Sequence, residues 1–234
     1  DVVTHRNFRK FSVYTKLVLL ATVVLVLGGA VIIALLEWNN PATLGNMDVG
    51  GKILNAFFQS VTTRTAGFAG LDQAALTDGG KAASIFLMLI GGASGSTAGG
   101  VKMITMLVLV LFIVSRARGR NSVTVFRRNV PQEKIMDAAT IITIVAGLAF
   151  AGAVFITATS PVNFTNALYE TVSALATVGL TAGATTQLGT AAQIMIIVFM
   201  YFGRVGVLTI SLGFLMGDKA EDRFKYADTN LLIG

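Results

Sequence analysis

The sequence predicts an all-α membrane protein built from two similar units. Hydrophobic residues make up 54% of the chain and charged residues only 13%, whereas a soluble domain carries about 25% charged residues. Apolar runs long enough to cross a bilayer flank shorter amphipathic segments, and this order occurs twice. Such an internal duplication indicates a repeated unit of two spans with a short helix between them.

The first unit is expected to cover residues 1–129. The run 17–36 has no charge and, at about 1.5 Å per residue, spans a hydrocarbon core of about 30 Å. Residues 50–68 begin with an amphipathic stretch too short to cross, which predicts a re-entrant segment. A second span is expected at 81–114, but five of the ten residues 91–100 are glycines. This glycine density disfavours a continuous helix and predicts two half-helices around an intramembrane loop.

The second unit is expected to cover residues 130–217 with the same order. Its spans are predicted at about 135–157 and 191–216, and its re-entrant segment at 163–180. That segment opens with an asparagine, a residue type that caps helix N-termini. Residues 218–234 carry mixed charge and are expected to form a cytoplasmic tail.

The basic residues flank the apolar spans, which indicates a multi-pass protein with both termini in the cytoplasm. The densest basic stretch lies at the end of the first unit and contains Arg116, Arg118, Arg120, Arg127 and Arg128. Basic residues in these places fit the positive-inside rule and argue against nucleic-acid binding, despite a net charge of +6. We expect the plasma membrane as the location and the lipid bilayer as a partner.

A Thr-x-Gly triplet follows each short amphipathic segment, within residues 62–68 and 176–180. A single triplet is usually an ordinary turn, but two copies at equivalent places favour pore loops. Glycine tolerates positive φ, so such a loop can aim successive carbonyls at one axis and replace the water around a cation. A short helix that ends at each loop adds the negative end of its dipole. The candidate ion-binding residues are Thr65, Ala66, Gly67, Phe68, Thr177, Val178, Gly179 and Leu180.

Four motifs together resemble the Trk/Ktr/HKT superfamily of potassium transporters, and most of all its KtrB-type membrane subunits. They are Thr-Arg-Thr-Ala-Gly-Phe (63–68), Gly-Ala-Ser-Gly-Ser-Thr-Ala-Gly-Gly-Val-Lys (92–102), Ala-Thr-Val-Gly-Leu (176–180) and Phe-Gly-Arg-Val-Gly (202–206). The resemblance covers essentially the whole chain and implies a potassium-channel-like pore made of four repeats. This chain resembles the third and fourth repeats. We expect that an N-terminal half is absent here; the alternative is a two-repeat chain that pairs with another.

The resemblance also implies the partners and the ions. Potassium is the expected substrate, possibly with sodium, and no cofactor is expected in this chain. The membrane subunits are expected to form a homodimer on a cytosolic, nucleotide-binding regulatory ring of the KtrA type. The tail either stays solvated or docks, through its apolar residues 231–233, between subunits or on that ring.

The glycine-rich loop resembles the family's intramembrane gate, although a kink that only lets helices pack is the simpler alternative. Arg204 lies about 20 Å into the closing span at helical rise, where an arginine is functional by default. The resemblance gives it the role of a positive barrier below the filter; plain interhelical pairing is the alternative. Lys102 either lines the same cavity or snorkels. The expected gate residues are Gly91, Gly92, Ala93, Ser94, Gly95, Ser96, Thr97, Ala98, Gly99, Gly100, Lys102 and Arg204. Arg64, beside the first loop, is expected to hold that loop by hydrogen bonds or to lie in the vestibule.

Other classes of function fit the sequence less well. The phosphate-loop pattern GxxxxGK[ST] fails because Lys102 stands one place late. A serine protease of the rhomboid type needs a histidine base, and the sole histidine is His5, in the basic entry segment. We therefore expect no enzyme. A broken-helix secondary transporter for another solute remains an alternative, as does an assembly subunit without transport.

Overall fold

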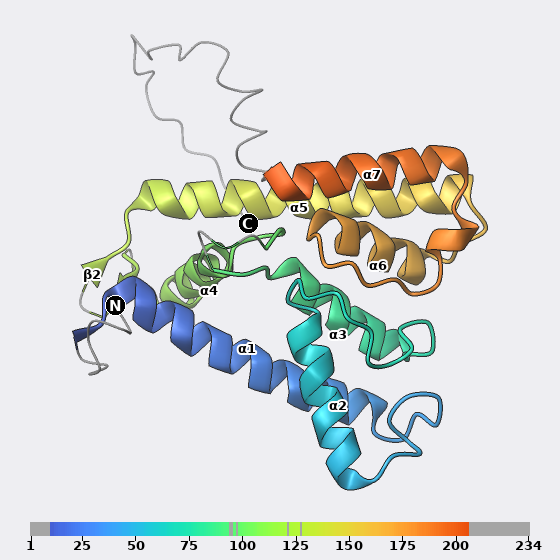
Figure 1. Ribbon diagram of the computed structural model, residues 1–234. Helices are drawn as coiled ribbons and strands as arrows, with labels where there is room; N and C mark the ends of the chain where they lie inside the picture. The colour runs from blue at the N-terminus through green and yellow to red at the C-terminus, as the bar shows by residue number, and fades with distance from the viewer. Residues whose placement is uncertain (1–9, 94–95, 97, 121, 127, 206–234) are drawn as a thin grey trace.

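The computed structural model describes residues 10–93, 96, 98–120, 122–126 and 128–205. The described part is mainly helical (Figure 1), which confirms the predicted all-α class. Its helices are α1 (Val13–Glu37), α2 (Val49–Thr62), α3 (Asp78–Leu89), α4 (Met103–Ala117), α5 (Gln132–Thr159), α6 (Phe164–Leu175), the short 3-10 helix η2 (Thr185–Gln187) and α7 (Thr190–Val205).

A small antiparallel hairpin joins the two halves of the chain. Its strands are β1 (Thr124–Val125) and β2 (Arg128–Asn129), with Thr124 opposite Asn129 and Val125 opposite Arg128. The sequence predicts only a basic loop for this stretch. The hairpin forms because Val123 and Val125 are buried against apolar side chains of α1, α4 and α5.

Two helices of the described part are long and apolar enough to cross a membrane, and both match expected spans. α1 has 25 residues and contains the predicted span 17–36; α5 has 28 and contains 135–157. α4 and α7 are shorter apolar helices. Residues 206–216 of the predicted closing span and the tail 218–234 lie outside the described residues.

α2 and α6, the short helices that precede the Thr-x-Gly loops, each have a side-chain N-cap. The Asp48 carboxylate accepts from the N–H groups of Gly50 and Gly51 at the start of α2. The Asn163 side chain accepts from the Asn166 N–H at 2.8 Å at the start of α6, as the sequence predicted. Each cap satisfies N–H groups that lack partners at a helix N-terminus. Both helices end directly before a Thr-x-Gly loop.

The predicted interruption of the third apolar stretch is present. α3 ends at Leu89 and α4 begins at Met103, and we call residues 91–100 between them the gate segment. Its base is closed by backbone hydrogen bonds from Gly91 N–H to the Val101 carbonyl (2.8 Å) and from Val101 N–H to the Leu89 carbonyl (3.1 Å). The two ends of the gate segment therefore lie side by side, between the end of α3 and the start of α4.

Buried polar groups fasten the C-terminal end of each first span. Glu37, fully buried at the end of α1, accepts from the N–H (3.0 Å) and hydroxyl (2.6 Å) of Thr77, which caps α3. Ser160, at the end of α5, accepts from the Gly189 N–H at 3.0 Å, just before α7. Both units thus tie the end of one span to the start of the next.

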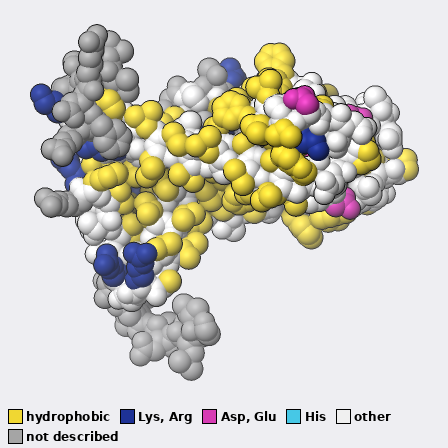
Figure 2. Space-filling view, turned by 90° about the horizontal axis from the view of Figure 1, so that it is seen from below, with side chains coloured by type: hydrophobic (Ala, Val, Ile, Leu, Met, Phe, Trp, Pro, Cys, Tyr) yellow, Lys and Arg dark blue, Asp and Glu magenta, His cyan; other side chains and the backbone are white. Residues whose placement is uncertain are grey.

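The two units meet where α3 packs against α6 (Figure 1) and where α4 packs against α5. The main core lies at the contact of α3 with α6. This core joins side chains of α3, α5, α6 and α7 to residues of the second loop. The outer surface is apolar as well. On the face shown in Figure 2, hydrophobic side chains cover much of the middle of the molecule. Leu35 is 76% exposed and Leu54 68%. An outer surface of this kind fits a protein surrounded by lipid.

Candidate functional site: two paired loops and a gate segment

The two Thr-x-Gly loops have the same unusual backbone. In the first loop (residues 63–68) φ is 66° at Thr65 and 77° at Gly67. In the second loop (residues 176–180) φ is 51° at Thr177 and 92° at Gly179. A positive φ is uncommon for a residue other than glycine, so a repeated pattern of this kind reflects a shared requirement. Alternation in the sign of φ turns the peptide planes and lets successive carbonyls face one side.

The two loops touch each other through their backbones. A Cβ atom built on Gly67 would lie only 2.2 Å from the carbonyl oxygen of Val178. A Cβ atom on Gly179 would lie 3.8 Å from the Cα atom of Gly67. The first loop therefore admits only glycine at position 67, and the Val178 carbonyl is aimed at the first loop. Residues 112 apart in the sequence meet at one place.

Hydroxyl groups at the ends of the short helices fix the far end of each loop. The Thr62 hydroxyl donates to the Phe68 carbonyl at 2.6 Å and accepts from the Phe68 N–H at 2.8 Å. The Ser173 hydroxyl donates to the Leu180 carbonyl at 2.6 Å. The carbonyls of Phe68 and Leu180 thus turn toward the short helices.

Buried polar side chains of the short helices also hold the chain after each loop. Glu170 of α6 is 6% exposed and accepts from the hydroxyl (2.5 Å) of Thr181, the N–H (3.0 Å) of Ala182 and the hydroxyl (2.8 Å) of Thr185. In the first unit Gln59 of α2 pairs with Gln73. Sequence reasoning missed these braces, although a polar residue inside a short apolar helix is a signal that can reveal them.

Hydrogen bonds connect the gate segment to both loops. The Arg64 guanidinium donates to the Gly91 carbonyl at 3.1 Å, so Arg64 reaches the gate segment from the first loop. At the other end, the Gly99 N–H donates to the Thr177 hydroxyl at 3.1 Å. A Cβ atom on Gly99 would lie 2.4 Å from that hydroxyl and 2.8 Å from the Ala176 carbonyl oxygen. The gate segment therefore lies directly against the second loop.

Two positively charged side chains, those of Lys102 and Arg204, lie near the gate segment. The Lys102 amine donates to the Ala98 carbonyl at 2.5 Å and to the Ser96 carbonyl at 3.3 Å. These bonds hold Lys102 against the gate segment, and the two roles that the sequence suggested for it, lining the cavity or snorkelling, stay predictions. Arg204 is exposed in the last turn of α7, next to Gly203, whose Cβ position lies 3.0 Å from the Thr177 side chain. Of the predicted gate residues, Ser94, Gly95 and Thr97 lie outside the described residues.

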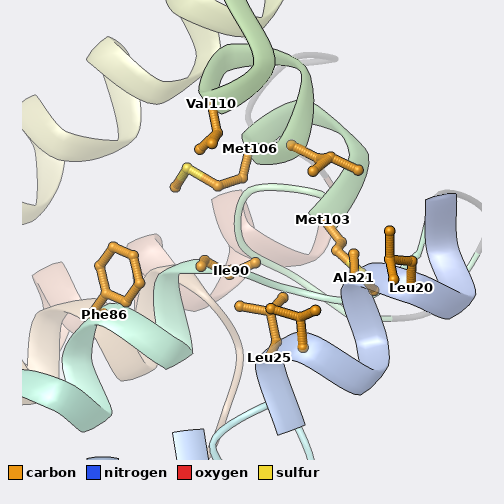
Figure 3. Close-up of a pocket in the computed structure, with 10 residues that line it drawn as sticks. Leu20, Ala21, Leu25, Phe86, Ile90, Met103, Met106 and Val110 are labelled. Atoms are coloured by element: carbon orange, nitrogen blue, oxygen red, sulfur yellow. The ribbon is translucent and has the colours of Figure 1, made fainter. Parts of the chain in front are cut away.

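An apolar groove borders the base of the gate segment (Figure 3). It has a volume of about 260 Å³ and lies between α1, α3 and α4. Ile90 and Met103, the residues on either side of the gate segment's base, belong to its lining. The groove is lined by Leu20, Ala21, Val24, Leu25, Phe86, Ile90, Met103, Met106, Leu107 and Val110. Apolar packing thus anchors the base, while the Gly91 carbonyl and the Gly99 N–H of the segment are bonded to the two loops.

Comparison with known proteins identifies the family. Residues 3–223 match the TrkH family model, described as cation transport protein. The chain belongs to the TrkH family. The match covers nearly all of the sequence, so both Thr-x-Gly loops and the gate segment lie inside it. Membership of a family of cation transport proteins also argues against an enzyme, as the sequence predicted.

Curated relatives and a solved structure agree with this assignment. The Ktr system potassium uptake protein B of Bacillus subtilis is 36% identical over all of this chain and 52% of its own length. The protein of the same name from Vibrio alginolyticus is 36% identical over the whole chain and 51% of its length. The potassium/sodium uptake protein NtpJ of Enterococcus hirae is 31% identical, over the whole chain and 53% of its length. This TrkH-family chain therefore spans about half the length of these relatives.

The fold also matches a solved TrkH-family structure. The crystal structure of the potassium transporter TrkH from Vibrio parahaemolyticus superposes with a TM-score of 0.67 at 22% identity. The match covers 85% of this chain and 43% of that one. At this identity the likeness shows the helical fold alone.

Proposed function

We propose that this chain forms part of a potassium-selective pathway across the plasma membrane, as half of a Ktr-type membrane subunit. The observation that carries the proposal is the pair of Thr-x-Gly loops with the same alternating φ, in direct backbone contact. The carbonyls of residues 65–67 and 177–179 are the proposed ion ligands. Those of Phe68 and Leu180 already accept hydroxyl donors, so we assign them a supporting role.

The chemistry of a dehydrated monovalent cation supports this assignment. Such an ion needs several oxygens at once, and rows of backbone carbonyls supply them in ion-selective filters. α2 and α6 both end at the loops, so each directs the negative end of its dipole, equivalent to roughly half an elementary charge, at the same place. In the proposal, two loops of a fourfold set come from this chain and the others from further repeats.

The gate segment acts in this proposal as the barrier below the loops. It is hydrogen-bonded to the first loop through Arg64 and to the second through Thr177. Ions pass when the bond between Gly99 and Thr177 opens and the segment moves aside. Lys102 and Arg204 place positive charge beside the segment, which raises the electrostatic barrier to a cation while the segment is closed.

The assembly around the chain is part of the same proposal. The named relatives belong to Ktr systems or carry the name potassium/sodium uptake protein. On this basis we propose a homodimer of membrane subunits, a cytosolic KtrA-type ring that binds the nucleotide, and sodium as a second ion. Both termini would face the cytoplasm.

A broken-helix secondary transporter for another solute is the second candidate function. The interruption between α3 and α4 is common to both candidates, since such transporters bind solutes at unwound helix segments. A carrier for an organic anion needs fixed charges for its substrate, whereas the loops here offer backbone carbonyls and hydroxyls. The loops therefore favour a monovalent cation.

Uptake of ⁸⁶Rb⁺ tests the proposal. Cells that lack their own potassium uptake systems express the full protein, and unlabelled K⁺, Na⁺ or amino acids compete for uptake. We expect K⁺ to compete at much lower concentration than Na⁺, and amino acids to have no effect. If unlabelled K⁺ does not reduce ⁸⁶Rb⁺ uptake, or if amino acids reduce it, the proposal is overturned.

A further inference from the structure

A buried hydrogen-bond network lies behind the two loops and crosses from one unit to the other. Gln59 of α2 and Gln73 of the chain after the first loop exchange hydrogen bonds of 2.6 and 3.0 Å through their side-chain amides. Tyr169 of α6 donates its hydroxyl to the Gln73 amide oxygen at 2.8 Å. The side chains are 0%, 3% and 0% exposed for Gln59, Gln73 and Tyr169.

Gln73 uses its full hydrogen-bonding capacity. Its amide oxygen accepts from Gln59 and Tyr169, and its amide nitrogen donates to Gln59 and to the Leu71 carbonyl at 2.7 Å. A side-chain amide has two donors and two acceptor positions, so each is filled. A fully satisfied buried network of this kind has one arrangement and is rigid.

The network connects the parts that set the position of the two loops. Gln59 lies in the last turn of α2, just before the first loop, and Gln73 lies after it. Tyr169 lies in α6, which ends at the second loop. The loops themselves touch at Gly67 and the Val178 carbonyl. A bond between Tyr169 and Gln73 therefore ties the helix of one loop to the exit of the other.

We propose that the Tyr169 hydroxyl is a positioning group that sets the spacing between the two loops and thereby the preference for K⁺ over Na⁺. This inference rests on the proposed function of the loops as ion ligands. K⁺ is larger than Na⁺, so carbonyls held at the K⁺ distance coordinate Na⁺ poorly. Without the Tyr169 bond, α6 and the chain at Gln73 shift independently, and the oxygens close in on the smaller ion.

Tyr169→Phe tests the inference, because it removes one hydrogen bond and keeps the ring in the core. The measurement is the ratio of the Na⁺ to the K⁺ concentration that halves ⁸⁶Rb⁺ uptake by the full protein in cells, at matched abundance in the membrane. We expect this ratio to fall about fivefold, the equivalent of one net hydrogen bond, while Rb⁺ uptake continues. A purely structural role would lower abundance and leave the ratio unchanged.

Tyr201→Phe is the matched control, since it removes the same hydroxyl at a position that is 67% exposed. Its ratio should equal that of the wild type. Gln73→Met provides a second variant that removes all the bonds of Gln73, and its ratio should fall further than that of Tyr169→Phe. If Tyr169→Phe fails to reach the membrane, Gln73→Met decides. The purified protein is then heated with K⁺ or with Na⁺, and the ratio is that of the Na⁺ to the K⁺ concentration that gives equal protection against unfolding.

The outcomes separate the inference from the proposed function. A selective wild-type protein with an unchanged ratio in Tyr169→Phe, or in Gln73→Met where it decides, overturns the inference and leaves the proposed function intact. A wild-type protein with no preference for K⁺ overturns both. A fall in the ratio for Tyr169→Phe and Gln73→Met, absent in Tyr201→Phe, supports the inference.

Discussion

Gly67 offers the sharpest test of the loop pair, because two independent effects oppose any side chain there. Its φ of 77° lies in the left-handed region, where an L-residue costs about 1–2 kcal/mol. That free energy alone corresponds to a factor of about 5–30 in an equilibrium constant. In addition, the new Cβ atom would lie 2.2 Å from the Val178 carbonyl oxygen, and real Cβ atoms essentially never approach within 3.0 Å. The carbonyl must therefore move by at least about 0.8 Å.

The assay compares Gly67→Ala with Gly179→Ala. Gly179 also has a positive φ, of 92°, but its Cβ atom would meet only the Gly67 Cα atom, at 3.8 Å. We expect the half-saturating concentration of ⁸⁶Rb⁺ to rise about 5–30-fold in Gly179→Ala. In Gly67→Ala the rise should be larger and the preference for K⁺ over Na⁺ should be lost.

Gly147→Ala is the control, since nothing lies within 4 Å of its Cβ position in α5. Replacement of a helical glycine by alanine stabilises by about 0.5–1 kcal/mol, so its transport should equal that of the wild type. Wild-type affinity and selectivity in Gly67→Ala, at wild-type abundance, would refute the reasoning. A greater effect of Gly179→Ala than of Gly67→Ala would refute the contact between the loops.

Three further substitutions test the surroundings of the site. Gly203→Ala places a Cβ atom 2.2 Å from the Leu175 carbonyl oxygen, so thermal melting in detergent should show a loss of about 1–3 kcal/mol. Gly28→Ala, in α1 with nothing within 4 Å of its Cβ position, should melt at the wild-type temperature or slightly above it. Equal melting of the two variants contradicts the packing of α7 on α6. Glu37→Gln places an amide N–H₂ among the donors of Asn40, Thr43 and Thr77 and should lower the free energy of unfolding by about 1–3 kcal/mol. Glu133→Gln, at the exposed start of α5, is the control and should have no such effect. A wild-type melting temperature for Glu37→Gln would contradict this expectation. Lys102→Met removes the bonds to Ala98 and Ser96 and should raise the uptake rate of ⁸⁶Rb⁺ without the regulatory partner; a lower or unchanged rate contradicts the role of Lys102 in closing the gate segment.

Much of the fold was predictable because it depends on local pattern. The apolar runs predicted α1 and α5, and the glycines of 91–100 predicted the break between α3 and α4. The duplicated order predicted that two loops occupy equivalent places, and they share their backbone conformation. The hairpin of β1 and β2 was missed because Val123 and Val125 become buried only through contacts with distant helices.

The groups that hold the site could not be predicted, since their partners lie far away in the sequence. Tyr169 meets Gln73 across 96 residues, and Gly99 meets Thr177 across 78. A buried tyrosine on an amphipathic helix reads equally well as core. The sequence placed Arg64 beside the first loop, but its bond to the Gly91 carbonyl depends on how the gate segment folds back.

The site of ion binding is tested most directly by anomalous scattering from Rb⁺ or Tl⁺ in crystals of the full protein. We expect a peak of density beside the contact between Gly67 and Val178, within reach of the carbonyls of residues 65–67 and 177–179. At a low Rb⁺ concentration, an excess of Na⁺ should weaken this peak. A structure with Rb⁺ bound elsewhere and none at these carbonyls would contradict the central claim.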